Sequence, residues 1–215
     1  MKLRNLGIWE KEITDIAKEQ FPKTETFIDI GANIGYYTLL AKSQNVKYCY
    51  AFEPKELNFN ILEENVKLND YSNCFLYDIG LGNEEGELHF GYNDTKSGHG
   101  SFLNNVKSIQ NLDKNITKKV KKLDNIEIKG NSIGIKLDVE GFELQVLEGM
   151  SKLFQSGKIK FMLIEISRKF YGIEVESSII NILKDNFDKL NVIESNSLLT
   201  DTLPGFPQYN ILATK

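Results

Sequence analysis

Acidic side chains close or directly follow five apolar segments that the sequence predicts as strands. The five acids are Asp29, Glu53, Asp78, Asp138 and Glu165. Because ligands of open parallel sheets bind beyond the carboxyl ends of the strands, we expect these side chains to converge on one rim. Ionised carboxylates accept hydrogen bonds, and where two lie close together one of them can take up a proton near neutral pH. The sequence therefore predicts a site for binding and proton transfer at this rim.

A turn with two glycines four positions apart follows the first predicted strand. In the segment FIDIGANIG, Gly31 and Gly35 come directly after the strand 26–30. Glycine lets the backbone turn sharply and approach a ligand closely, and free N–H groups at a helix start suit a nucleotide-type ligand. Asn33 occupies the middle position and no glycine stands at the sixth, so the turn departs from G-x-G-x-x-G. It suits a nucleoside with an amino-acid tail, such as S-adenosylmethionine, whose charged groups would meet this turn and Asp29.

Two of the acids are predicted to contact the nucleoside itself. Glu53 follows Gly31 by roughly 20 residues, the distance at which a carboxylate accepts hydrogen bonds from ribose hydroxyls. The alternative for Glu53 is a solvated strand end. Asp78 is predicted to accept a hydrogen bond from the exocyclic amine of adenine, with the backbone of Ile79 as the alternative.

The elements that must position these residues alternate in type. Apolar patterning predicts strands at 26–30, 47–52, 74–79, 133–138 and 161–167, and helices at 8–21, 34–43, 142–155 and 175–187, with a further helix from Leu57 to Leu68. This order implies parallel strands joined by right-handed crossovers. Strands near 190–194 and 209–213 close the chain, and the last is expected to be antiparallel. Trp9 is interpreted as a core residue of the first helix, with a substrate platform as the alternative.

The region of about 86–128 breaks this alternation. Segment 86–93 alternates like a hairpin strand, 95–101 is a loop rich in glycine and serine, and 116–128 alternates again. The pattern predicts a small antiparallel insertion or cover. The lysine run KKVKK is interpreted as a solvated strand face rather than a nucleic-acid site, because acids follow at once.

Composition predicts one globular domain over residues 1–215. Hydrophobic residues make up 41% and charged residues 26%, which argues against disorder, and a net charge of −4 is unfavourable for binding nucleic acid. No apolar run approaches the ~20 residues of a membrane span, and the first residues lack the apolar core of a signal peptide. Cys49 and Cys74 are interpreted as free thiols. We therefore expect a cytoplasmic protein without a nucleic-acid partner; the sequence gives no indication of oligomeric state.

Three segments, in this order and spacing, resemble the FkbM family of S-adenosylmethionine-dependent methyltransferases. They are FIDIGANIGYYTLL, AFEP and IKLDVEGFELQVLEGM, and the resemblance covers roughly residues 25–170. It implies an α/β class I methyltransferase (Rossmann-like) fold, with a mostly parallel seven-stranded sheet and helices on both faces. It implies O-methylation of a hydroxyl on a sugar or natural product, with S-adenosylhomocysteine as product. By this resemblance Gly31 and Gly35 line the cofactor, Glu53 holds the ribose and Asp138 lies near the reactive end.

Transfer of a methyl group to an alcohol requires a general base, because the hydroxyl proton becomes acidic during the displacement. The candidates are Asp138, Glu140, Glu165 and His99. Asp138 and Glu165 end neighbouring strands and could share the site, and His99 lies in a loop that could cover it. Capping of the following helix is the alternative for Asp138 and Glu140. Two close carboxylates could also hold a divalent cation, but no metal site is predicted.

Two other functions stay open from the sequence. One is a nicotinamide-dependent oxidoreductase, against which the missing third glycine argues. The other is a methyltransferase-like binding module that has lost catalysis. The methyl acceptor itself is not encoded in any pattern of the sequence, and residues 95–128 and the C-terminal strands are expected to shape its pocket.

Overall fold

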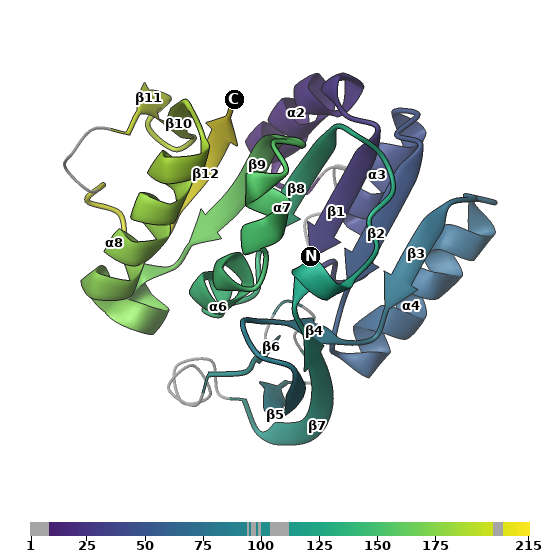
Figure 1. Ribbon diagram of the computed structural model, residues 1–215. Coiled ribbons are helices and arrows are strands. Elements are labelled where there is room, and N and C mark those ends of the chain that lie inside the picture. Colours follow the sequence, from purple (N-terminus) through teal and green to yellow (C-terminus); the bar gives the residue numbers. More distant parts are fainter. Residues whose placement is uncertain (1–8, 94, 96–97, 99, 104–111, 200–203) are drawn as a thin grey trace.

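A large sheet with helices on both faces forms the body of the molecule, and a small second sheet lies across one of its edges (Figure 1). The computed structural model describes residues 9–93, 95, 98, 100–103, 112–199 and 204–215. His99 lies outside these residues. That residues 1–215 form one domain stays a prediction.

The large sheet contains eight strands among the described residues, in the order β11-β10-β12-β9-β8-β1-β2-β3. Their bounds are β1 Thr26–Ile30, β2 Tyr48–Phe52, β3 Cys74–Tyr77, β8 Ile133–Leu137, β9 Ile159–Ile166, β10 Lys189–Val192, β11 Ser197–Leu198 and β12 Tyr209–Thr214. The strands from β9 to β3 are parallel, whereas β12 and β10 pair antiparallel. The mostly parallel sheet and the antiparallel final strand are confirmed. The predicted count of seven misses β11, because its two residues are too few to form a pattern.

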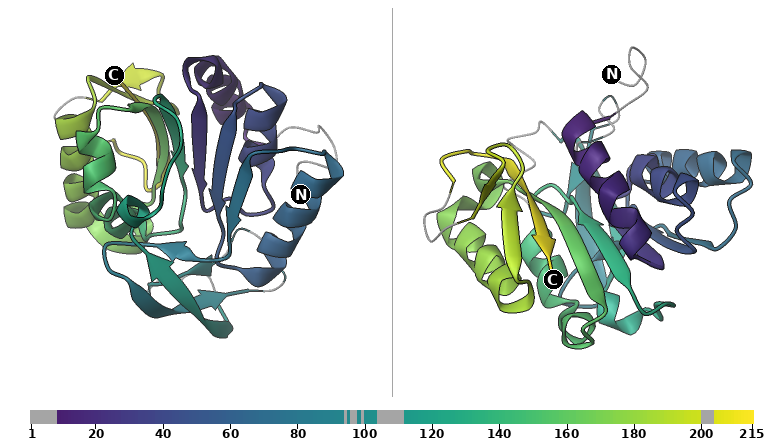
Figure 2. Two further views of the ribbon diagram at one scale, coloured as in Figure 1. Left: turned by 45° about the vertical axis from the view of Figure 1, so that its right-hand side comes forward. Right: turned by 90° about the horizontal axis from the view of Figure 1, so that it is seen from above.

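Helices cover both faces of this sheet. They are α2 Lys11–Gln20, α3 Tyr36–Ser43 and α4 Glu56–Leu68, and α6 Glu143–Glu148, α7 Ser151–Gln155 and α8 Arg168–Asn186, with a short 3-10 helix at Phe21–Lys23. In the right panel of Figure 2 the purple and blue helices lie on one side of the sheet and the green helices on the other.

Two predicted helices differ from those observed. The helix expected at 142–155 is broken at Gly149, where a side chain would lie 2.0 Å from the carbonyl oxygen of Gly82. The close approach of these two backbone segments therefore separates α6 from α7. Helix α8 begins seven residues earlier than predicted because a first turn precedes a kink at Gly172, whose φ is 78°.

The core forms because every residue of β1 and β8 is buried and successive side chains point to opposite faces. Phe27 packs beneath α2 and α3, with ring centroids 5.0 Å from Phe21 and 6.5 Å from Phe161. Gly134 on the adjacent strand makes room for Phe161, since a side chain there would lie 2.1 Å from that ring. Cys49 and Cys74 are neighbours in β2 and β3 and are free thiols, as predicted.

The small sheet has the order β4-β7-β5-β6 and lies at the carboxyl-terminal edge of the large sheet (Figure 1). Its strands are β4 Gly80–Leu81, β5 Gly86–Tyr92, β6 Gly100–Ser101 and β7 Lys114–Lys121. Strand β5 pairs antiparallel with β6 and β7, which confirms the predicted insertion; the pairing of β4 with β7 is parallel. A short 3-10 helix, Leu123–Asn125, replaces the end of the strand expected at 116–128.

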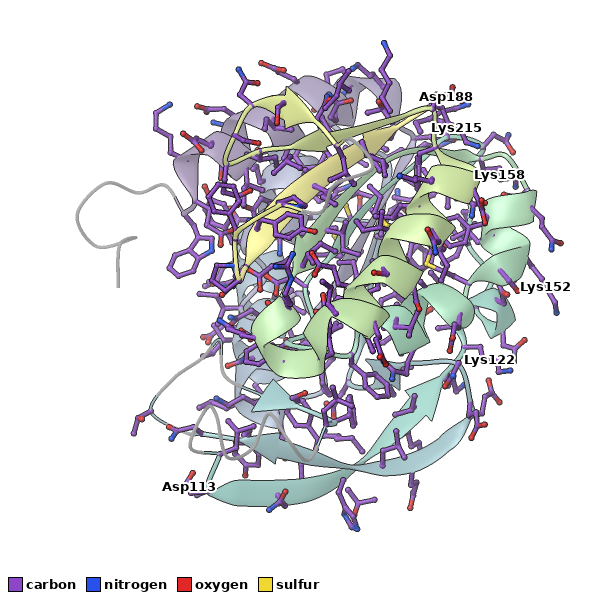
Figure 3. The ribbon with its side chains drawn as sticks, turned by 90° about the vertical axis from the view of Figure 1, so that its left-hand side faces the viewer. Asp113, Lys122, Lys152, Lys158, Asp188 and Lys215 are labelled. Atoms are coloured by element: carbon purple, nitrogen blue, oxygen red, sulfur yellow. The ribbon has the colours of Figure 1, made fainter. Side chains whose placement is uncertain are left out.

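The lysines of β7 differ in their surroundings. Lys119 and Lys121 are exposed, whereas Lys118 is partly buried. Lys122 lies just beyond the tip of the β7 arrow in Figure 3.

None of the helices in the described ranges is both long and apolar enough to cross a bilayer.

Replacing Phe161 by alanine is expected to lower the free energy of unfolding by about 3–5 kcal/mol, because the ring is fully buried and leaves a cavity between Phe21 and Phe27. Chemical denaturation measures the loss. Leu68→Ala is the control, since its side chain is 73% exposed and should change stability by no more than about 0.5 kcal/mol. Equal effects of the two substitutions would contradict this packing.

Candidate functional site

A cavity of about 780 Å³ opens at the carboxyl-terminal edge of the parallel strands, under the small sheet. Its volume falls within the roughly 300–1,000 Å³ of small-molecule sites. The predicted residues that line it are Asp29, Gly31, Asn33, Glu53, Asp138 and Glu165. The structure thus brings together side chains that are as much as 136 positions apart, from Asp29 to Glu165.

The glycine turn is fixed by close backbone contacts. The N–H groups of Gly31 and Ala32 both donate to the carbonyl of Phe52, at 3.0 Å each. Gly31 has a φ of 80°, and a side chain there would lie 1.8 Å from the carbonyl oxygen of Asp138. Gly35, with a φ of 90°, begins α3 and faces Leu62 rather than the cavity. The missing side chain lets α3 pack on α4, and Gly35 is not among the residues that line the cavity, so its contact with the cofactor stays a prediction.

Glu53 is buried directly after β2 and holds two backbone segments. Its Oε2 accepts a hydrogen bond from the N–H of Asn33 at 2.8 Å, and its Oε1 accepts one from Lys55 at 2.9 Å. Burial raises the pKa of Glu53 to about 7, although these bonds oppose the shift. A carboxylate offers about four acceptor positions, so Glu53 retains capacity for a hydroxyl donor that enters the cavity.

Two neighbours of Glu53 that the sequence analysis missed complete this side of the cavity. Asn58 contributes a further hydrogen bond to Glu53 from the first turns of α4. Lys55 is 2% exposed, and its Nζ donates to the carbonyl of Asn93 at 2.7 Å, which ties this rim to the small sheet. Their position at a helix start directly after a strand-end acid is the signal that could have identified them.

Asp78 does not lie where the sequence analysis expected it. Its two carboxylate oxygens accept hydrogen bonds from Lys118 at 2.5 and 2.6 Å, and it is not among the residues that line the cavity. The adjacent Ile79 does line the cavity. The ion pair with β7 draws the Asp78 side chain away, so we withdraw the adenine contact assigned to it.

A buried lysine, also missed from the sequence, stands among the acids at the ends of β1 and β8. Lys136 is 6% exposed, and its Nζ donates to Asp138 at 2.8 Å and lies 4.9 Å from the centre of the Tyr37 ring. Burial alone would lower the pKa of Lys136, but the nearby charges of Asp138 and other acids raise it. Asp29 is buried beside it and accepts a hydrogen bond from Thr38 at 2.6 Å. Lys136 could have been identified from the sequence, because it is a charged residue inside the apolar strand segment that ends in Asp138.

Glu165 and Asp138 line the same cavity, as the strand-end argument predicted. Burial, and after it the charge of Asp138, raises the pKa of Glu165 to about 7. Hydrogen bonds from Gln208 and from Ser167, the latter at 3.0 Å, oppose this shift. Gln208 in turn accepts a hydrogen bond from Lys169. Glu165 therefore has the pKa of a general base that works near neutral pH.

The side chain of Glu143 holds the turn that follows β8. Glu140 and Gly141 have φ values of 52° and 102°. The Oε1 atom of Glu143 accepts hydrogen bonds from Val139 at 3.2 Å and from Gly141 at 3.1 Å, and the buried Oε2 atom has no hydrogen-bond partner among the described residues. Burial raises the pKa of Glu143 to about 8.

The helix-capping alternative is wrong for Asp138. Helix α6 has Phe142 at its N-cap and no side chain bonded there, whereas Asp138 bonds to Lys136. Glu140 lines the cavity. Within the described ranges, no three His, Cys, Asp or Glu side chains are grouped so as to hold a metal ion.

The sequence is similar to those of known methyltransferases. A model of the FkbM methyltransferase domain matches residues 29–191. Methyltransferase 1 of Beauveria bassiana is 26% identical over 149 residues, which cover 60% of this chain and 60% of that protein. The hexuronic acid methyltransferase AglP of Haloferax volcanii is 28% identical over 167 residues, which cover 73% of this chain and 62% of that protein. The chain thus spans less than two thirds of either relative.

Solved structures share the fold at low identity. A methyltransferase from Streptococcus mutans in complex with S-adenosylhomocysteine has a TM-score of 0.53 at 12% identity, covering 96% of this chain and 99% of that one. A precorrin-6y C5,15-methyltransferase from Geobacter metallireducens has a TM-score of 0.51 at 13% identity, and the match covers 98% of this chain and 93% of that one. These similarities confirm the predicted class I methyltransferase fold.

Glu143→Gln is expected to flatten the pH dependence of stability. The pKa of Glu143 is raised from 4.5 to about 8 on folding, so the folded protein keeps a proton that the unfolded chain releases. The resulting contribution to the free energy of unfolding is fully present below pH 4.5. It is lost as the pH rises towards about 8, by up to about 1.4 kcal/mol per pH unit. Glutamine does not titrate, so the variant should lack this slope in denaturation series. Exposed Glu64→Gln is the control, and identical slopes for both variants would refute the raised pKa.

Proposed function

The chain belongs to the FkbM methyltransferase family, and on this basis we propose that it transfers a methyl group from S-adenosylmethionine to a hydroxyl of a small acceptor, a sugar unit in first place. The observation that carries the proposal is Glu53, bonded to the glycine turn in the wall of a cavity of suitable size. The relative that acts on hexuronic acid favours a sugar acceptor. Family membership sets aside the oxidoreductase alternative.

We assign the adenosine to the side of the cavity that contains Glu53. The carboxylate there would accept hydrogen bonds from the ribose hydroxyls, and the backbone of Ile79 would meet the adenine edge. Apolar side chains line the same cavity and suit a flat base, among them Leu81 of β4 and Phe142 at the N-cap of α6.

The amino-acid tail is assigned to the charged side of the cavity. Asp29 and the backbone of Gly31 would meet its ammonium group, and the ammonium of Lys136 would meet its carboxylate. Pairing of opposite charges in a largely buried site is needed because an unpaired buried charge is costly.

When bound, S-adenosylmethionine supplies an electrophilic methyl group. The residues of this chain must bring the acceptor oxygen into line with it, which is mainly a matter of positioning. Glu165 takes the proton of the acceptor hydroxyl, because its pKa of about 7 makes it a base near neutral pH. Asp138, fixed by Lys136, orients the acceptor beside Glu165. The role predicted for His99, the cytoplasmic location and the absence of a nucleic-acid partner stay predictions.

Isothermal titration calorimetry with S-adenosylhomocysteine tests cofactor binding. The wild-type protein should bind, and Glu53→Ala should weaken the affinity by at least about tenfold, because a ribose hydroxyl loses its acceptor and the glycine turn loses a hydrogen bond. Glu56→Ala is the matched control, since Glu56 is exposed at the start of α4 and should leave binding unchanged. Absence of binding to the wild type, or equal affinities for Glu53→Ala and wild type, would refute the proposal.

Methyl transfer should depend on the ionisation of Glu165. With labelled S-adenosylmethionine and an acceptor-containing cell extract, the rate should rise as pH increases through about 7, because only the ionised carboxylate takes up the proton. Glu165→Gln should lower turnover by roughly 10²- to 10⁴-fold and leave the affinity for S-adenosylhomocysteine unchanged. Intact cofactor binding without any transfer by the wild type would instead indicate a binding module.

A further inference from the structure

Glu10 has an unusual backbone for a residue at the start of a helix. It occupies the N-cap of α2, but its side chain makes no capping bond and its φ and ψ are 43° and 69°. A non-glycine residue in this left-handed region is strained, and such strain persists where the surrounding structure enforces it, often at functional sites. The side chain that could have capped α2 lines the cavity instead.

The carboxylate of Glu10 meets groups from two other elements inside the cavity. Its Oε2 accepts a hydrogen bond from the Tyr37 hydroxyl at 3.0 Å. Burial raises the pKa of Glu10, the charge of Lys136 opposes this, and the charge of Asp138 adds to it. Glu10 is therefore close enough to the ends of β8 and α3 to act on a molecule held beside Asp138.

Trp9 lines the same cavity and is partly exposed. Its side chain is 38% exposed, so its interpretation as a core residue is wrong. Its carbonyl accepts a hydrogen bond from Thr14 at 2.6 Å, and its indole bonds to Glu10. An aromatic ring that is fixed in place, partly exposed and adjacent to a carboxylate offers an apolar face and hydroxyl acceptors side by side.

We propose that Trp9 and Glu10 form the acceptor-binding wall of the cavity and receive a sugar ring, with its C–H face on the indole and its hydroxyls on the carboxylate. This inference rests on the proposed function and names the acceptor site. Glu53 and Asp29 are assigned to the ribose and the ammonium of the cofactor, which leaves Trp9 and Glu10 for the acceptor. Gln208 lines the same cavity and adds amide hydrogen-bonding groups for further hydroxyls.

Trp9 is the single tryptophan of the chain, so its fluorescence reports on this wall directly. The protein is first saturated with S-adenosylhomocysteine and then titrated with D-glucuronate, D-glucose and N-acetyl-D-glucosamine. At least one of these sugars should change the Trp9 emission saturably. Glu10→Ala should raise the apparent dissociation constant of that sugar by at least about tenfold, and the affinity for S-adenosylhomocysteine should stay within about twofold of wild type.

Glu12→Ala is the control, because Glu12 is exposed in the first turn of the same helix and should leave both titrations unchanged. Glu10→Gln keeps the size of the side chain and replaces Glu10→Ala should the latter fail to fold. The acceptor wall is refuted if no sugar alters the emission. It is also refuted if Glu10→Ala weakens the binding of S-adenosylhomocysteine and leaves the binding of the sugar unchanged. Failure of S-adenosylhomocysteine to bind the wild type would instead refute the proposed function itself.

Discussion

The buried carboxylate of Glu53 is the interaction on which the cavity depends. It accepts hydrogen bonds from the backbone of Asn33 in the glycine turn and of Lys55 before α4, so one side chain fixes both segments relative to β2. Burying a carboxylate costs free energy unless its oxygens are hydrogen-bonded. Because these two donors are backbone groups, the conformation of the turn and the position of the carboxylate determine each other.

The opposite side of the cavity is organised by charge. Lys136 is surrounded by acids from three elements, namely Glu10, Asp29 and Asp138. Burial, and after it the charge of Asp138, raises the pKa values of Glu143 and Glu165 to about 8 and about 7. Strongly shifted pKa values of this kind, in a cavity, are typical of catalytic sites. Asp138 is held in this arrangement by its hydrogen bond from Lys136, and Glu165 can exchange a proton near neutral pH.

Much of this architecture could be predicted from the sequence because it depends on local pattern. The apolar strands, the glycine turn and the strand-end acids follow from side-chain period and from the rule that ligands bind at strand carboxyl ends. Other features depend on contacts distant in sequence: the Asp78 side chain is directed by Lys118, and the break at Gly149 by Gly82. The strained backbone of Glu10 cannot be recognised from the spacing of apolar residues. Lys136, in contrast, can be recognised in the sequence as a charged residue within an apolar strand segment.

The most direct test of the account is a crystal structure with S-adenosylhomocysteine bound. We predict a ribose hydroxyl within about 3 Å of the Glu53 carboxylate, with the hydrogen bonds from Asn33 and Lys55 still in place. A structure in which the adenosine lies elsewhere, or in which Glu53 turns away from the glycine turn, would contradict it.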